Sequence, residues 1–262
     1  MGWVFDEDTD LVPTGAGTWT VDVSDRWNIG PTPNGGFLMA LLIRAAAEMS
    51  PQPDPLSVTA HYLGRTDPGP VSIRAALVKP GRNFSTVEAS LFQGDRERVR
   101  MLGTFGDLDH QRGPTRIVAT RPELGPDEGL VRNDTDSSVV KIADRFDLLL
   151  PPEQAAGVLG TPTGNARVTG KVRFSDGRPP DLVSLALFAD AFPPTVFQLG
   201  HYTWIPTIEL TVHFRAKPAP GWLWCDFRTR FLIDGLMEED GEIWDETGRP
   251  VALSRQLARV PA

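Results

Sequence analysis

The segment LVSLALFADAFPP, residues 182–194, places a single acid among apolar side chains. Read with helical periodicity, the apolar residues cover almost the whole circumference, which predicts a helix buried on most sides. Asp190 lies at the end of that helix, before Pro193 and Pro194 terminate it. A carboxylate in such surroundings is poorly solvated, so its charged form is disfavoured unless hydrogen bonds compensate. Asp190 is therefore a candidate general base, and a helix-capping or ion-paired acid is the plainer alternative.

The elements around Asp190 belong to a repeat. Residues 57–73 (SVTAHYLGRTDPGPVSI) align with residues 209–225 (ELTVHFRAKPAPGWLWC), so that His61 lies over His213 and Gly69 over Gly221. The offset is constant, because 213 − 61 and 221 − 69 both equal 152. Identity between the copies is low, and the shared apolar register is the evidence. The matching positions of the two histidines favour a packing role over catalysis.

Each copy is predicted to form a short leading strand and then about four antiparallel strands. Alternating apolar residues indicate the strands, and Pro, Gly, Asp and Asn indicate short turns between them. The first copy is predicted to contain strands at residues 18–23, 58–63, 71–78, 84–93 and 99–105. The second copy is predicted to contain strands at residues 166–174, 207–214, 223–231, 242–245 and 251–260, with residues 239–241 as a turn.

One apolar helix precedes the main strands of each copy. Asn34 is the expected N-cap of the helix FLMALLIRAAAEM, and Pro51 lies beyond its end. Asp181, after two prolines, opens the second helix, where prolines are tolerated and an acid is favoured. A sheet that curls around one central helix buries that helix on most sides. This arrangement explains the apolar character all around both helices.

The predicted fold class is α+β, with two antiparallel sheets that each wrap around a central helix. We place the N-terminal unit at residues 1–108, a connector at residues 109–164 and the C-terminal unit at residues 165–262. The connector is rich in Pro, Gly and Asp. We expect it to cross the surface with some structure of its own, including an amphipathic piece near residues 139–150.

Composition excludes several classes of function. A net charge of −8 over 262 residues argues against a nucleic-acid surface, and no Lys/Arg run indicates an anionic membrane partner. The longest apolar run, residues 37–43, is too short to span a bilayer, and the acidic start lacks a basic and apolar leader. Cys225 is the single cysteine, which excludes an internal disulfide and a Cys-based zinc site. We therefore expect a cytoplasmic protein without a bound metal, whose ligand is a small molecule or another protein.

The predicted architecture resembles the double hotdog fold, and the sequence resembles the TesB-like acyl-CoA thioesterase II family. The most specific elements are NGGFLMA at residues 34–40, SVTAHYLGRTDPGP at residues 57–70, and LFAD, IPTIELTVHF and VALSRQ in the second copy. The resemblance covers both copies and leaves the connector unmatched. It implies a hydrolase that converts an acyl-CoA substrate into a free fatty acid and CoA, needs no cofactor and forms homo-oligomers.

In that family an Asp, a Thr and a Gln of the second unit hold the water that attacks the thioester. The resemblance places these roles on Asp190, on Thr207 and on Gln256. The offset of 152 residues places Pro55 opposite Thr207 and Thr104 opposite Gln256, so only the second copy carries the triad. A carboxylate, a hydroxyl and an amide can share one water. Asp190 acts either as a base through that water, which we favour, or as a direct nucleophile.

The developing oxyanion also needs hydrogen-bond donors. Two consecutive glycines, Gly35 and Gly36, let the backbone approach a ligand closely at the start of the first helix. Unpaired N–H groups of a helix N-terminus favour negative charge. We therefore expect the backbone N–H groups near Gly36 and Phe37 to face the triad from the other unit.

Two rival functions remain open from the sequence. A hotdog hydratase or dehydratase would bind the same kind of substrate, but no histidine closely follows Asp190, and His201 is separated from it by a proline-rich turn. The other rival is a non-catalytic protein that binds acyl-CoA or another acyl ligand. Such a protein would bind acyl-CoA without releasing the thiol.

Overall fold

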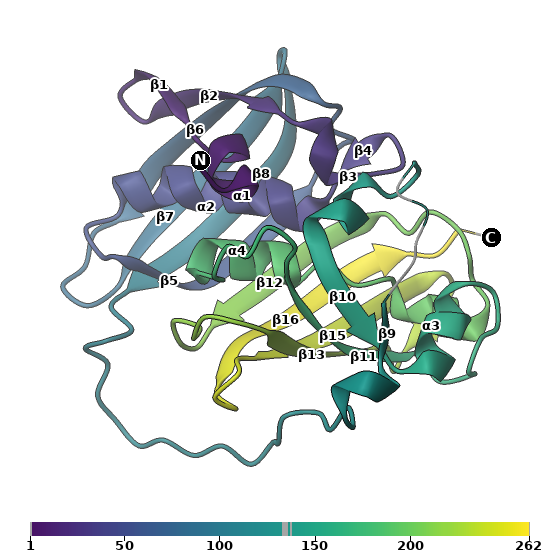
Figure 1. The fold of residues 1–262 in the computed structure, drawn as a ribbon. Helices are drawn as coiled ribbons and strands as arrows, with labels where there is room; N and C mark the ends of the chain where they lie inside the picture. Colours follow the sequence, from purple (N-terminus) through teal and green to yellow (C-terminus); the bar gives the residue numbers. More distant parts are fainter. Residues whose placement is uncertain (1, 133–135, 137, 262) are drawn as a thin grey trace.

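The computed structural model describes residues 2–132, 136 and 138–261. Antiparallel strands and one long helix make up its N-terminal half (Figure 1). The elements of this half are α1 (Val4–Asp8), β1 (Val12–Gly15), β2 (Thr18–Val23), η1 (Asp25–Trp27), β3 (Asn28–Ile29), β4 (Thr32–Pro33), α2 (Gly35–Met49), β5 (Asp54–Tyr62), β6 (Gly69–Lys79), β7 (Ser85–Gln93) and β8 (Arg96–Gly106). All five strands predicted for this half are present.

The C-terminal half repeats this composition with a much shorter helix. Its elements are β11 (Arg167–Phe174), α4 (Leu182–Phe188), η4 (Thr195–Leu199), β12 (Thr207–Phe214), β13 (Leu223–Arg228), β14 (Leu232–Ile233), β15 (Leu236–Trp244) and β16 (Pro250–Arg259). The strand predicted at residues 242–245 begins earlier, at Leu236. The predicted turn at residues 239–241 therefore lies inside β15, and that prediction is wrong.

The strands form one continuous sheet rather than the two sheets that we predicted. The sheet has 14 strands in the order β1-β2-β6-β7-β8-β5-β12-β16-β15-β13-β11-β10-β9, with β14 paired to β15 and with β9 and β10 contributed by the connector. The prediction of separate sheets is wrong because β5 and β12 pair antiparallel and join the halves. β3 and β4 form a separate two-stranded ribbon.

The two halves carry the same strand order outward from the seam between β5 and β12. The order is β5-β8-β7-β6-β2 in one direction and β12-β16-β15-β13-β11 in the other. Thr59 pairs with Thr211 at the seam, and their hydroxyl oxygens lie 2.8 Å apart. These two residues are separated by 152 positions, so the seam agrees with the repeat offset read from the sequence.

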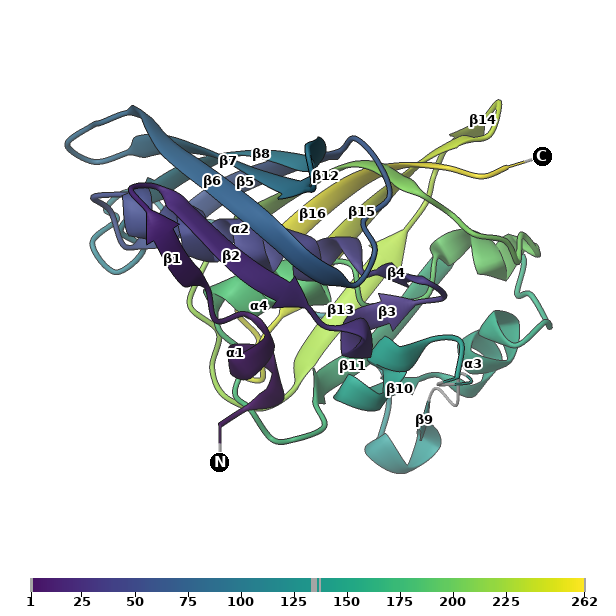
Figure 2. The same cartoon turned by 90° about the horizontal axis from the view of Figure 1, so that it is seen from above.

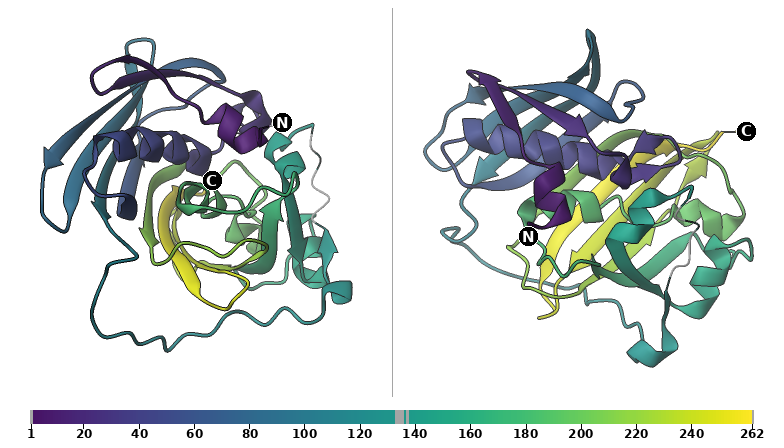
Figure 3. Two further views of the ribbon diagram at one scale, coloured as in Figure 1. Left: turned by 60° about the vertical axis from the view of Figure 1, so that its left-hand side comes forward. Right: turned by 45° about the horizontal axis from the view of Figure 1, so that its top comes forward.

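Both central helices lie on the same side of the sheet (Figures 1 and 2). α2 packs on β5 to β8 and also contacts α4, and the strands of the second half curve around α4 (Figure 3). The predicted N-cap Asn34 is confirmed, because its side chain accepts from Phe37 N. Asp181 opens α4 as predicted, and it does so as the N-cap, in a capping box with Ser184. Among the described residues, no helix has the length and apolar composition that crossing a bilayer demands.

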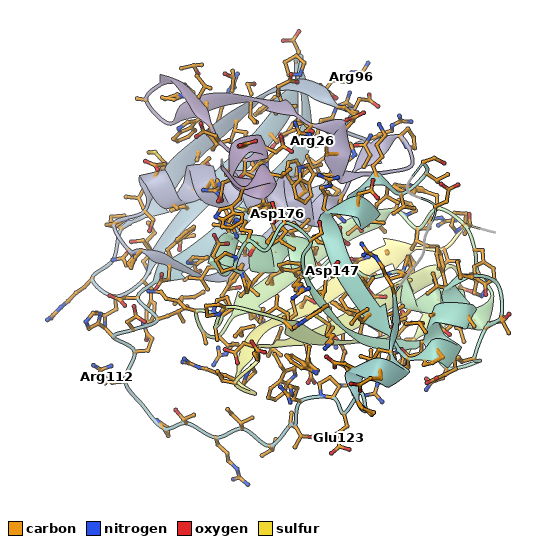
Figure 4. The ribbon with its side chains drawn as sticks, viewed as in Figure 1. Arg26, Arg96, Arg112, Glu123, Asp147 and Asp176 are labelled. Atoms are coloured by element: carbon orange, nitrogen blue, oxygen red, sulfur yellow. The ribbon has the colours of Figure 1, made fainter. Side chains whose placement is uncertain are left out.

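The connector is built into the fold along its second part. Residues 107–126 run along the periphery without helix or strand, and Arg112 and Glu123 lie on this stretch (Figure 4). The following elements are η2 (Asp127–Gly129), β9 (Val131–Arg132), η3 (Lys141–Arg145), β10 (Phe146–Leu150) and α3 (Pro152–Val158). β10 pairs with β11, and β9 pairs with β10, so the connector extends the sheet of the second half.

Candidate functional site

A cavity of about 570 Å³ lies between the start of α2, the segment after α4 and the strands β12, β15 and β16. Small-molecule pockets are typically about 300–1,000 Å³, with apolar walls and a few polar groups. The apolar walls include Leu38, Ile142, Phe146, Leu148, Val158 and Phe197. The polar lining includes Asn34, Tyr62, Asp190, Thr207, Glu239 and Gln256. The cavity can therefore hold a ligand that has an apolar part and a reactive polar group.

Asp190 lies two residues beyond the end of α4, is half-buried and lines the cavity. Its Oδ2 accepts hydrogen bonds from Asn34 Nδ2 and from the backbone N–H of Gly36, each at 2.9 Å. Both donors belong to the N-terminal turn of α2, where backbone N–H groups and the helix dipole favour a negative charge. The helix of the first half therefore holds the carboxylate of the second half.

Asn34 connects the two halves through both ends of its amide. Its Oδ1 accepts from the backbone N–H of Phe37 at 2.9 Å, which caps α2. Its Nδ2 donates to Oδ2 of Asp190 and, at 2.7 Å, to the backbone oxygen of Asp190. Only the cap was expected from the sequence, because the contact with Asp190 spans 156 positions and has no local signal.

The surroundings of Asp190 keep it ionised at neutral pH and still basic. Burial raises the pKa of Asp190 to about 6, and hydrogen bonds from the backbone of Gly36 and Gly35 and from Asn34 partly oppose this rise. A general base works best when its pKa lies near the working pH.

Tyr62 also lines the cavity, and its hydroxyl donates to the Gly35 carbonyl at 2.8 Å. Burial, together with the charges of Asp190 and Glu209, raises the Tyr62 pKa well above its ordinary value, so its hydroxyl stays protonated.

Thr207 and Gln256 line the same cavity as Asp190. Thr207 is the first residue of β12, at an irregularity in the pairing of β12 with β16, and such bulges often adjoin functional sites. Gln256 lies on β16 with 8% of its surface exposed, whereas its neighbour Leu257 is 38% exposed. The structure thus brings the three predicted residues to one cavity, and their role in catalysis stays a proposal.

The predicted oxyanion donors have other partners in the structure. Gly36 N donates to Asp190 Oδ2, and Phe37 N donates to Asn34 Oδ1. These bonds correct the prediction, because neither N–H group is free to meet an oxyanion. The glycine is needed for the close approach of the two helices, since a Cβ at Gly36 would lie 2.5 Å from the carbonyl oxygen of Ala186.

Glu239 is a cavity residue that the sequence analysis missed. It lies on β15 with 9% of its surface exposed, and its Oε2 accepts from Thr195 N at 3.0 Å and from Thr195 Oγ1 at 2.7 Å. Burial and the charge of Asp190 raise the pKa of Glu239 to about 7. The alternation of Met237, Glu239, Gly241 and Ile243 on the buried face is the signal that could have identified it. We instead interpreted the Glu-Asp-Gly sequence as a turn.

The two repeat histidines weighed from the sequence do not line the cavity. His61 and His213 are exposed on the outer face of the sheet, so the predicted packing role for them is wrong. Arg65 lines the cavity and forms an ion pair with Asp67 at 2.9 Å. The connector, in contrast, supplies much of the apolar wall, through Ile142, Phe146, Leu148 and Val158.

Comparisons with known proteins identify the family to which the chain belongs. Residues 23–106 match the sequence model of the acyl-CoA thioesterase N-terminal domain, and residues 121–260 match that of the C-terminal domain. The thioesterase-like protein TwmA of Talaromyces wortmannii is 35% identical over 98% of this chain and 92% of its own length. The two matched domains together cover most of the chain.

Solved structures share the fold over nearly the full length. A candidate thioesterase II from Thermobifida fusca is 34% identical, with a TM-score of 0.91 over 99% of this chain and 98% of that one. A hotdog-fold protein from Alicyclobacillus acidocaldarius is 21% identical, with a TM-score of 0.90 over 100% and 99% of the two chains. The fold is therefore a hotdog fold, and the chain belongs to the TesB-like acyl-CoA thioesterase family.

Proposed function

We propose that the chain is an acyl-CoA thioesterase of double-hotdog architecture, which converts acyl-CoA and water into a free fatty acid and CoA. The observation that carries this proposal is the half-buried Asp190 carboxylate on a largely apolar cavity that Thr207 and Gln256 also line. Membership in the thioesterase family supports the reaction class. The residue types around the cavity support a hydrolysis that uses one positioned water.

In the proposed reaction, Thr207 and Gln256 hold a water beside Asp190. The carboxylate accepts a proton from that water while its oxygen attacks the thioester carbonyl carbon. When the C–S bond breaks, the departing thiolate takes this proton from Asp190, which restores the base. Asn34 and Gly36 fix the carboxylate during the cycle, because their hydrogen bonds to Oδ2 leave Oδ1 for the water.

The apolar walls suit the acyl group of such a substrate. Ile142, Phe146 and Leu148 of the connector and Phe197 of η4 offer side chains without charge, while the thioester must reach the polar lining. Burying an apolar chain against these walls contributes about 25 cal/mol per Å² of apolar surface removed from water. This binding would position the thioester without any charged contact to the acyl group.

A thiol-release assay over a series of acyl-CoA chain lengths tests the proposal. The parent protein should release CoA, and Asp190→Asn should lower kcat by about 10²–10⁴-fold, the usual contribution of a general base. Asp147→Asn is the matched control, because Asp147 on β10 pairs with Arg173 at 3.0 Å and does not line the cavity. Equal rates in the parent and in Asp190→Asn would refute the proposed site.

The same assay separates the rival functions. A non-catalytic acyl-binding protein would bind an acyl-CoA analogue, as calorimetry would record, without releasing any thiol. A hydratase or dehydratase would act on the acyl chain, but no histidine is found among the described residues that line the cavity. Homo-oligomers, a cytoplasmic location and the absence of a cofactor stay predictions from the sequence.

A further inference from the structure

Two carboxyl groups, Asp190 and Glu239, line one cavity, and no cation among the described residues is bonded to either. The side-chain donors to Asp190 and Glu239 are Asn34 and Thr195, which are both uncharged. Arg65 is the cation among the described lining residues, and it pairs with Asp67. Ionising both carboxyl groups of one poorly solvated site is energetically unfavourable, so one of them keeps a proton.

Glu239 is the acid that keeps the proton. The pKa of Glu239 is raised to about 7 and that of Asp190 to about 6, in each case mainly by burial. Asp190 accepts from two groups at the N-terminus of α2, which stabilises its ionised form. Between these two pKa values, Asp190 is ionised and Glu239 is mostly neutral.

Charged groups near Glu239 in the sequence face away from it. Glu238 and Asp240 on β15 point to the opposite face of the sheet, where Asp240 pairs with Arg255 of β16 at 2.6 Å. On the inner face, β13 contributes Cys225, whose thiol is kept neutral because burial raises its pKa. η4 contributes no ionisable side chain. Asp190 is therefore the charge that Glu239 responds to.

The hydrogen bonds of Glu239 determine which of its oxygens can donate. Oε2 accepts two hydrogen bonds from Thr195, and the Thr195 hydroxyl lies 2.7 Å from that of Thr229. Because the Thr195 hydroxyl gives its only proton to Oε2, Thr229 must be the donor to Thr195. This chain fixes the carboxyl group and leaves the proton of Glu239 on Oε1.

Glu239 is the direct cross-strand partner of Gln256 in the pairing of β15 with β16. Both residues are buried and line the cavity, and the Cβ atoms of such partners lie about 4.5–5.5 Å apart. Gln256 is one of the residues that we propose to hold the water. A donor next to it lies close to the carbonyl group that this water would attack.

We propose that Glu239 is a further catalytic residue, which as a neutral carboxylic acid donates a hydrogen bond from Oε1 to the thioester carbonyl oxygen. This inference rests on the proposed thioesterase function. The water oxygen bonds to the carbonyl carbon, the water proton goes to Asp190, and the carbonyl electron pair moves to the oxygen that Glu239 stabilises. The C–S bond then breaks as the carbonyl group forms again, the thiolate takes the proton from Asp190, and Glu239 keeps its own proton throughout.

Two substitutions at Glu239 give opposite expectations. Glu239→Gln keeps a donor, because Thr195 would bond to the amide oxygen and leave the amide N–H toward the cavity, but it cannot ionise. It should keep kcat within about tenfold near pH 6.5, and it should lack the fall in kcat/KM that we expect in the parent above pH 7. Glu239→Leu has no donor and should lower kcat by about 10²–10³-fold with little change in KM, as for a lost oxyanion donor.

Glu242→Gln on the same strand is the matched control and should behave like the parent, because Glu242 does not line the cavity. A parent-like kcat in Glu239→Leu would overturn the proposal. So would a Glu239→Gln variant that keeps the parent's fall in activity above pH 7. If Glu239→Leu does not fold, the dependence of kcat/KM on pH in Glu239→Gln still tests the proposed role of Glu239.

A readout that needs no activity separates this inference from the proposed function. In protein labelled with ¹³C at glutamate carboxyl carbons, one signal should titrate near pH 7 and be missing from Glu239→Gln. Titration of that signal near the ordinary value of 4.5 would overturn the inference even in an active thioesterase. A signal near 7 in a protein that hydrolyses no acyl-CoA would refute the proposed function and leave the neutral acid in place.

Discussion

The two halves of the molecule share a strand order and differ in their helices. α2 has 15 residues and α4 has 7, which correspond to about 22 Å and about 10 Å of helix. The long helix fills the curve of its part of the sheet, whereas the short one leaves part of its sheet to be covered by loops and by the connector. The cavity lies in that remaining space, and Asp190 follows the point where α4 stops. The two halves therefore share a scaffold, and the cavity lies where the shorter of the two helices stops.

The largest expected effect comes from breaking the contact between the halves at Gly36. Gly36→Val would push a side chain into the carbonyl oxygen of Ala186, so we expect a loss of about 3 kcal/mol in the free energy of unfolding or failure to fold. Gly129→Val is the control, because a Cβ there meets no atom within 4 Å. Urea unfolding compares the two variants. Equal stabilities would show that the helices can separate at little cost.

A second test compares equivalent positions of the two halves. Gln256→Ala should lower kcat/KM for acyl-CoA by about 10²-fold, because the proposed water loses one of its partners. Thr104→Ala, at the position 152 residues earlier on β8, should change kcat/KM less than about twofold. Similar losses in both variants would contradict the assignment of the chemistry to the second half alone.

The folded protein should also lose stability as Asp190 in the second half ionises. The pKa of Asp190 in the folded protein, about 6, exceeds its ordinary value of 3.8. The stability that this group contributes is therefore complete below pH 3.8 and is lost as the pH rises through about 6. Asp190→Asn removes that loss, so it should be more stable than the parent by about 2 kcal/mol at pH 8 and by almost nothing at pH 4. Urea unfolding at both pH values measures this, and Asp147→Asn should show no such gain.

The smallest expected effect concerns the wall that only the second half receives from the connector. Ala143 of η3 lines the cavity, so Ala143→Phe should fill part of the space that a long acyl chain would occupy. We expect kcat/KM for long chains to fall about tenfold, which is about 1.4 kcal/mol, while short chains are affected less. Ala143→Ser controls for substitution without added bulk. A change in kcat/KM that is the same for all chain lengths would show that the connector does not contact the acyl chain.

Local patterns in the sequence predicted most of the scaffold. The strands at residues 18–23 and 207–214 have the predicted bounds, and Asn34 caps the predicted helix. Alternation and turn residues are local signals, so they can be recognised without knowing which strands pair. The joining of both halves into one sheet and the pairing of β10 with β11 depend on partners that no local pattern identifies.

The site was predicted less completely, for physical reasons that Gln256 and Glu239 illustrate. Hydrophobicity alone predicts that Leu257 points inward and Gln256 outward. The opposite is found, because Gln256 points toward the cavity and Leu257 is exposed. Glu239 was hidden because Glu-Asp-Gly is also typical of a turn, although here Gly241 lets the Phe227 ring pack against the strand. Gly36 was correctly placed beside Asp190, but its hydrogen bond to the carboxylate depends on a contact between the halves. Phe37 N instead donates to Asn34, the local helix cap.

The seam between β5 and β12 has a consequence for biosynthesis. β5 ends at Tyr62 and β12 begins at Thr207, so a ribosome must add 145 residues before the seam can close. At about 5–20 residues per second, this takes about 7–29 s. During that interval the nascent N-terminal half exposes the unpaired backbone groups of β5, which is a template for pairing with other chains. Truncation before β12 should therefore yield aggregates rather than a stable half-protein, and chaperone binding should concentrate in this window.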